Sequence, residues 1–151
     1  MKLQNMKRSE DTEQIQVFNW EKVSRQYYKQ LKWLYHIANG GLRVKGEATK
    51  LKAMGVKAGV SDICFPFPHG VYHVLFVEMK YGDNKPTEKQ LEFLQDMQEA
   101  GHFTAVCYSA QAAVEIIRSY MELKDGQTMD MDSIKQKCMK VQYNNEIPYV
   151  W

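Results

Sequence analysis

Apolar and polar positions alternate along this chain with two different periods, which separate expected helices from expected strands. Apolar residues at three- and four-residue spacing predict a first helix that begins after the N-cap Ser9 and ends at about Leu34. Its expected buried stripe comprises Trp20, Val23, Tyr27, Leu31 and Leu34. Further helices are expected at residues 46–54, 87–100 and 110–123, with a short one at 131–139.

Four short apolar runs bounded by turn residues predict β-strands. They are expected at residues 33–37, 63–65, 72–77 and 103–108. The turn Pro66–Gly70 separates the second and third runs, so these two pair as an antiparallel hairpin. The helix at 87–100 opens with a capping box of Thr87 and Gln90 and is long enough for a right-handed crossover to a parallel strand. The order of elements therefore predicts an α/β fold in which helices flank a mixed central β-sheet.

The 151 residues suit one domain with its own core, which we expect to span residues 1–124. Residues 125–151 form a polar tail with an apolar end, which is expected to pack on the domain or in a dimer interface. No apolar run approaches the roughly 20 residues that cross a bilayer, and no signal peptide is recognisable. Three cysteines without regular spacing give no disulfide framework or zinc motif, which favours a reducing, cytoplasmic environment.

Two carboxylates and one ammonium group are expected to meet at the end of the hairpin. Asp62 precedes its first strand, while Glu78 and Lys80 end its second strand, two residues apart and therefore on one face. Such charges beside buried strands are costly unless something binds them, and paired carboxylates suit a hard divalent cation. A lysine beside that cation can orient or deprotonate a water. The alternative interpretation makes Asp62 a turn residue and the other two a solvated edge pair.

The net charge of +2 excludes a strongly basic nucleic-acid-binding chain, but the basic residues are unevenly placed. Five basic residues and one acid, Glu47, lie between residues 43 and 57. The candidates for contacts with a DNA backbone are Arg43, Lys45, Lys50 and Lys57. Such contacts position a protein without reading base sequence. A solvated helix face is the alternative interpretation of the same charges.

Several motifs occur in a fixed order over residues 8–120. They comprise Glu10, Gln14 and Trp20, the stretches 36–43 and 51–62, the triplet Glu78-Met79-Lys80, and Gln90. Together they resemble the virus-type replication–repair nuclease (VRR-NUC) family, a branch of the PD-(D/E)xK nucleases with a restriction-endonuclease-like core. Ala38 and Ser61 stand where that family usually has proline, which loosens the backbone near Asp62.

The resemblance implies a role for each residue of the hairpin motif. Asp62 and Glu78 would bind a catalytic Mg²⁺ or Mn²⁺, with the Met79 carbonyl as a further ligand. Lys80 would activate or position the attacking water. The metal would polarise a phosphodiester and lower the pKa of that water.

Two helical residues receive implied roles that have competing interpretations. Glu10 would complete the metal shell, directly or through water, although Glu13 is an alternative for the same role. Gln90 would brace the site, or would serve only the capping box of its helix. For both residues the sequence leaves the choice open, because a first-turn acid and a capping-box amide are common without any catalytic function.

The implied activity is metal-dependent, structure-selective cleavage of DNA that leaves a 5′-phosphate. Short stand-alone members of the family resemble Holliday-junction resolvases acting as homodimers, in which two-fold symmetry supplies two matching sites. The resemblance also suggests a phage or prophage origin, hence a bacterial or phage-infected cell. Two alternatives differ in class or substrate: a catalytically inactive module that binds branched DNA, and a nuclease that cuts flaps, splayed arms or duplex DNA.

Overall fold

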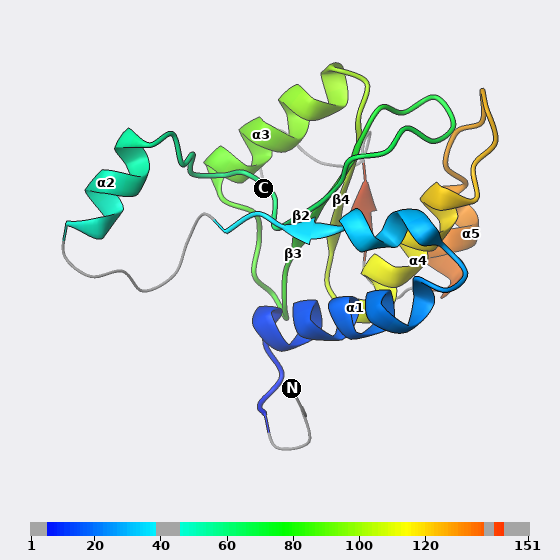
Figure 1. Ribbon diagram of the computed structural model, residues 1–151, viewed down its shortest axis with the longest axis horizontal. Helices are drawn as coiled ribbons and strands as arrows, with labels where there is room; N and C mark the ends of the chain where they lie inside the picture. Colours follow the sequence, from blue (N-terminus) through cyan, green and yellow to red (C-terminus); the bar gives the residue numbers. More distant parts are fainter. Residues whose placement is uncertain (1–5, 39–45, 138–140, 144–151) are drawn as a thin grey trace.

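A five-stranded mixed β-sheet forms the centre of the computed structural model, which describes residues 6–38, 46–137 and 141–143 (Figure 1). The strands β1 to β5 lie in sequence order across the sheet and comprise Tyr35–His36, Ile63–Phe65, Leu75–Met79, Phe103–Cys107 and Val141–Tyr143. β3 and β4 run parallel, and the other neighbouring pairs run antiparallel. The predicted α/β fold with a mixed sheet, including its hairpin and parallel crossover, is therefore confirmed.

Helices cover both faces of this sheet. They are α1 (Glu10–Ser24), the 3₁₀-helix η1 (Lys29–Trp33), α2 (Glu47–Ala53), α3 (Glu88–Glu99), α4 (Ala110–Met121) and α5 (Met131–Lys137). Side chains alternate along β4, so Ala105 and Cys107 lie in the main core with α1, α4 and α5, whereas Val106 packs with Leu91 and Leu94 of α3. Figure 1 shows α3 on one side of the central strands and α1 with α4 on the other. Coverage on both sides explains why these strands are buried along their length.

The first helix is shorter than predicted. α1 ends at Ser24, and the chain then turns into η1 instead of continuing as one helix to about Leu34. Two members of the expected buried stripe, Val23 and Tyr27, are 65% and 77% exposed. Leu31 and Leu34 are buried as predicted, but from η1 and its end rather than from a continuous helix.

The buried face of α1 is largely polar, which is why the apolar spacing indicated the wrong face. Its buried residues are Thr12, Glu13, Val17, Glu21 and Ser24. Arg8 forms an ion pair with Glu13, and Arg25 forms one with Glu21, so both buried carboxylates have a cationic partner. Pairing makes such burial tolerable, and a hydrophobicity pattern does not register it.

The described part of the predicted tail packs against the rest of the chain. Met131 and Ile134 of α5 lie in the main core, and β5 pairs antiparallel with β4. The apolar chain end at 149–151 lies outside the described residues. A division of the chain at residue 124 and a role of the tail in a dimer stay predictions. Within the part of the chain that the structure describes, no helix is long and apolar enough to cross a membrane.

Candidate active site

The Asp62 side chain joins the two strands of the hairpin at the rim of the sheet. It precedes β2, and its Oδ2 atom accepts a hydrogen bond of 2.7 Å from the backbone N–H of Met79, the last residue of β3. The Asp62 carbonyl is also held, because it accepts the backbone N–H of Ile37 at 2.8 Å and lies 2.7 Å from Nδ1 of His36. Burial raises the pKa of Asp62, and the hydrogen bond from the Met79 N–H, followed by the charge of Lys80, partly opposes that shift.

Glu78 lies almost fully buried at the end of β3. Its side chain forms an ion pair with Lys80, in which Nζ lies 3.1 Å from Oε1. The other carboxylate oxygen, Oε2, is buried and has no hydrogen-bond partner. Burial, followed by repulsion from Asp62, raises the pKa of Glu78 to about 8. A carboxylate that is buried, next to a second carboxylate and only half satisfied is a costly arrangement that a bound cation would relieve.

Lys80 is the third group that the hairpin brings to this point. Its backbone N–H donates to the Cys107 carbonyl at 2.9 Å, which anchors the residue to the end of the neighbouring parallel strand β4. Only 8% of its side chain is exposed. The sheet therefore holds the ammonium group beside Glu78 and out of bulk water, as the two-residue spacing on one strand face predicts.

Glu10 and Glu13, the two candidates on α1, lie in different environments. Glu10 accepts a hydrogen bond of 3.2 Å from the side-chain amide of Asn84, and its charge is among those that raise the pKa values of Asp62 and Glu78. Glu13 is instead buried against α4, where its Oε2 accepts the backbone N–H of Ala110 at 2.8 Å. The electrostatic link to the rim thus runs through Glu10.

Asn84, near the rim, was not singled out by sequence reasoning, whereas His36 opens the motif stretch 36–43 and was given no role of its own. Asn84 contacts Glu10 across 74 positions of sequence, and His36 reaches the Asp62 carbonyl because β1 pairs with β2. Asn84 belongs to no local motif. Only the docking of α1 brings it to Glu10, so no signal in the sequence identifies this contact.

Gln90 forms the capping box that its spacing predicts. Its side-chain oxygen accepts the backbone N–H of Thr87 at 2.8 Å, and its own N–H donates to the Thr87 hydroxyl at 3.3 Å. The described contacts of its side chain are thus those of a helix cap. A bracing role at the site stays a prediction.

The backbone that leads to Asp62 passes very close to α3. Gly59 has a φ of +90°, and a Cβ atom there would lie 2.4 Å from the Lys89 carbonyl oxygen, so only glycine fits without a shift. Ser61 follows, fully buried, and its hydroxyl lacks a hydrogen-bond partner. This segment is therefore fixed by close packing on α3 rather than by a proline at position 61.

Of the four residues predicted to contact DNA, two lie within the described part of the chain. Lys50 in α2 and Lys57 just beyond it are exposed, whereas Arg43 and Lys45 lie outside the described residues. α2 has no buried residue, and Figure 1 shows it extending away from the sheet. It connects to the site through the short segment that ends at Asp62.

The acids of the rim suit a hard divalent cation, although they do not form a finished ligand set. Among residues 6–38, 46–137 and 141–143, no three histidine, cysteine or acidic side chains are grouped closely enough to hold a metal ion. Asp62 and Glu78 nevertheless supply carboxylate oxygens, the donors that Mg²⁺ and Mn²⁺ prefer. The unpartnered Oε2 atom of Glu78 is a specific place where such a cation would fit.

Comparisons with known proteins find a family model and a solved structure that are similar to this chain. A family model described as the VRR-NUC domain matches residues 4–111. A solved structure described as a VRR_NUC domain protein has a TM-score of 0.66 and 30% sequence identity, over 79% of this chain and 93% of that chain. A comparison with curated proteins gives no match.

Proposed function

The chain belongs to the VRR-NUC family, whose fold is of the nuclease type, and we propose that it is a metal-dependent endonuclease that hydrolyses phosphodiester bonds in DNA. One observation above all supports this proposal. The buried Glu78 carboxylate lies between Lys80 and Asp62 with one oxygen unpartnered, an arrangement that costs stability unless it serves a bound cation.

Each rim residue has a distinct proposed role. Asp62 and Glu78 hold Mg²⁺ or Mn²⁺ together with the Met79 carbonyl, and the hydrogen bond from the Met79 N–H keeps the Asp62 carboxylate oriented. Glu10 completes the shell directly or through water. The metal supplies Lewis-acid stabilisation of charge on the phosphate oxygens and a lower pKa for the attacking water. Lys80 positions that water or takes part in its activation.

Branched DNA is the substrate that we propose, most specifically a four-way junction cut by a homodimer. Cutting a junction symmetrically needs two sites related by a two-fold axis, which a homodimer supplies. Contacts from Lys50, Lys57, Arg43 and Lys45 to phosphates would carry shape rather than base information. Flaps, splayed arms and plain duplex are the competing substrates.

A catalytically inactive module that holds branched DNA is the competing function. The absence of a grouped three-residue ligand set among the described residues favours it. The intact Asp62, Glu78 and Lys80 favour an enzyme, because a module that only binds DNA has no need for a buried carboxylate with an unpartnered oxygen close to a second carboxylate. Cleavage assays separate the two.

Replacing Asp62 by alanine is expected to abolish cutting while DNA binding persists. The experiment uses four-way junctions, flaps, splayed arms and duplex with Mg²⁺ or Mn²⁺, and measures cleavage and gel-shift binding in parallel. Loss of one metal-binding carboxylate should lower the rate by about 10²–10³-fold. Undiminished cutting by Asp62→Ala would remove the assigned site, and binding without cutting by the unaltered protein would support the inactive module.

Reversing the charge of Lys50 is expected to weaken DNA binding without changing the rate of the bound complex. Lys50→Glu removes one phosphate contact, so affinity should fall for all sequences alike and the slope of log affinity against log salt should decrease by about one. Lys124→Glu is the matched control, because Lys124 is exposed beyond α4, away from α2. An equal loss of DNA affinity in Lys50→Glu and Lys124→Glu would contradict a specific role for α2.

A further inference from the structure

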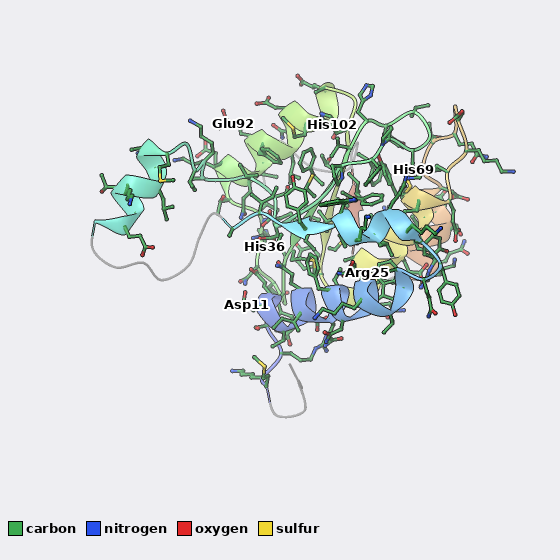
Figure 2. The ribbon with its side chains drawn as sticks, viewed as in Figure 1. Asp11, Arg25, His36, His69, Glu92 and His102 are labelled. Carbon is green, nitrogen blue, oxygen red and sulfur yellow. The ribbon has the colours of Figure 1, made fainter. Side chains whose placement is uncertain are left out.

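A cleft of about 570 Å³ opens beside the candidate active site, at the start of α1. Its walls include Lys7, Arg8 and Glu10 from the start of the chain and Tyr81 and Asn84 from the loop after β3. That volume falls in the range of roughly 300–1,000 Å³ that ligand clefts occupy. Figure 2 labels Asp11, another wall residue, at the N-terminal end of α1.

One wall of the cleft is a cation–π pair of two planar groups. The Arg8 guanidinium lies over the Tyr81 ring, 5.5 Å from its centroid. Arg8 is held there by its ion pair with the buried Glu13, whose other oxygen accepts the N–H of Ala110 at the start of α4. The Arg8 side chain nonetheless remains 64% exposed. The ion pair with Glu13 therefore fixes the position of Arg8, while much of its side chain stays open to solvent.

The cleft adjoins the acids of the rim. Tyr81 directly follows Lys80, and Glu10 belongs both to the cleft wall and to the charges that act on Asp62 and Glu78. The Asn84 amide, which donates to Glu10, ties the two walls together. A group lying in the cleft would thus be next to a phosphate that is bound at the rim.

We propose that this cleft is a subsite for one unpaired nucleotide beside the phosphate that is cut, with its base stacked on the Arg8–Tyr81 pair. Aromatic rings and guanidinium planes are the protein groups on which unstacked bases lie. The basic side chains Lys7 and Arg8 in the walls are matched by the acids Glu10 and Asp11, so the cleft offers no net positive charge to a phosphate and suits an uncharged base better. The inference rests on the proposed nuclease function and refines its substrate.

An unpaired nucleotide also gives a physical reason for selecting branched DNA. A base inside a duplex is stacked on both neighbours, and drawing it out costs free energy that is least where pairing is already broken. Flaps and splayed arms supply unpaired nucleotides directly, whereas a four-way junction supplies one only where a base pair at its branch point opens. The subsite would therefore favour branched over continuous duplex DNA without reading sequence.

The test combines a protein change with a base deletion in the DNA. Binding is measured to a branched DNA in Ca²⁺, with the nucleotides on either side of the cut either intact or abasic. Removing the stacked base should weaken binding to the unaltered protein by about ten-fold. Tyr81→Leu should weaken binding to intact DNA similarly, and should show little further loss on the abasic DNA, because both changes remove the same contact.

Two variants serve as controls in the same assay. Tyr81→Phe keeps the ring and should bind like the unaltered protein, which separates stacking from a general disturbance of the loop. Tyr27→Leu changes an exposed tyrosine beyond the end of α1 and should leave the ten-fold discrimination intact. A 2-aminopurine at the stacked position should change its fluorescence with the unaltered protein and not with Tyr81→Leu.

The outcomes distinguish this inference from the proposed function. The subsite alone would be overturned if the unaltered protein cleaves DNA but Tyr81→Leu still binds intact DNA more tightly than abasic DNA by the same factor as the unaltered protein. Binding coupled to Tyr81 without any cleavage in Mg²⁺ or Mn²⁺ would support the subsite and overturn the nuclease. Failure to bind any branched DNA would overturn both.

Discussion

Glu78→Gln is expected to abolish cleavage and at the same time to stabilise the metal-free protein by about 1–2 kcal/mol at pH 7. In the folded chain Glu78 is buried beside Asp62, and its pKa is about 8. In the unfolded chain a glutamate has a pKa of about 4.3, so folding at pH 7 forces an unfavourable protonation or an unfavourable buried charge. At pH 7 the raised pKa of Glu78 lowers the free energy of unfolding by roughly 3 kcal/mol. Glu78→Gln recovers only part of this, because the variant also loses the ion pair with Lys80.

The raised pKa of Glu78 also fixes the sign of the pH dependence of stability. Between about pH 4.5 and pH 8 the folded protein binds more protons at Glu78 than the unfolded chain does, so this residue lowers stability as pH rises. Glutamine has no proton to exchange. The advantage of Glu78→Gln should therefore be small at pH 5 and largest near pH 8, in urea melts with a chelator present.

Metal titration provides the second measurement on this variant. Mn²⁺ should raise the melting temperature of the unaltered protein, because a ligand that binds only the folded state stabilises it, and should do so far less for Glu78→Gln. Glu92→Gln is the control, since Glu92 is exposed on α3 (Figure 2). A destabilised Glu78→Gln, or one that still cuts DNA, would show that Glu78 is a structural ion-pair residue.

Local signals in the sequence were sufficient for the parts of the site that lie on one hairpin. The two-residue spacing of Glu78 and Lys80 places them on one strand face, where they form an ion pair. The turn after the strand of Ile63–Phe65 fixes the hairpin, and its register puts Asp62 beside the end of β3. Turn chemistry and strand alternation act over short distances, so they can be read without knowing the fold.

Features that depend on long-range docking could not be predicted in the same way. α1 buries Glu13 and Glu21, which no hydrophobic pattern anticipates, because their arginine partners make the burial tolerable. The Asn84 contact with Glu10 likewise exists only because α1 lies against the loop after β3. The sequence alone does not decide whether Glu10 or Glu13 faces the site. Their partners in the fold differ, since Glu10 contacts Asn84 and Glu13 contacts the start of α4.

Replacing Lys80 by methionine is expected to leave metal binding intact while it lowers the cleavage rate by about 10²–10⁴-fold. Methionine fills a similar volume but carries no charge, which suits the buried position of Lys80. A divalent cation is repelled by a nearby ammonium group, but Lys80 also lowers the pKa of Glu78, so the affinity for Mn²⁺ should be unchanged or higher in Lys80→Met once the pH is high enough to ionise Glu78. Calorimetric titration with Mn²⁺ and single-turnover cleavage at saturating metal give the two quantities separately.

Lys80→Arg tells how the ammonium group contributes. Arginine keeps the positive charge beside Glu78 but stays protonated in proteins, so it can position a water and cannot accept a proton from it. Because Lys80 forms an ion pair with Glu78 at 3.1 Å, we expect its charge to matter most and Lys80→Arg to recover part of the lost rate. A rate as low as that of Lys80→Met would assign proton transfer to Lys80 instead. Loss of Mn²⁺ binding in Lys80→Met, matching Glu78→Gln, would contradict the separation of roles between the two side chains.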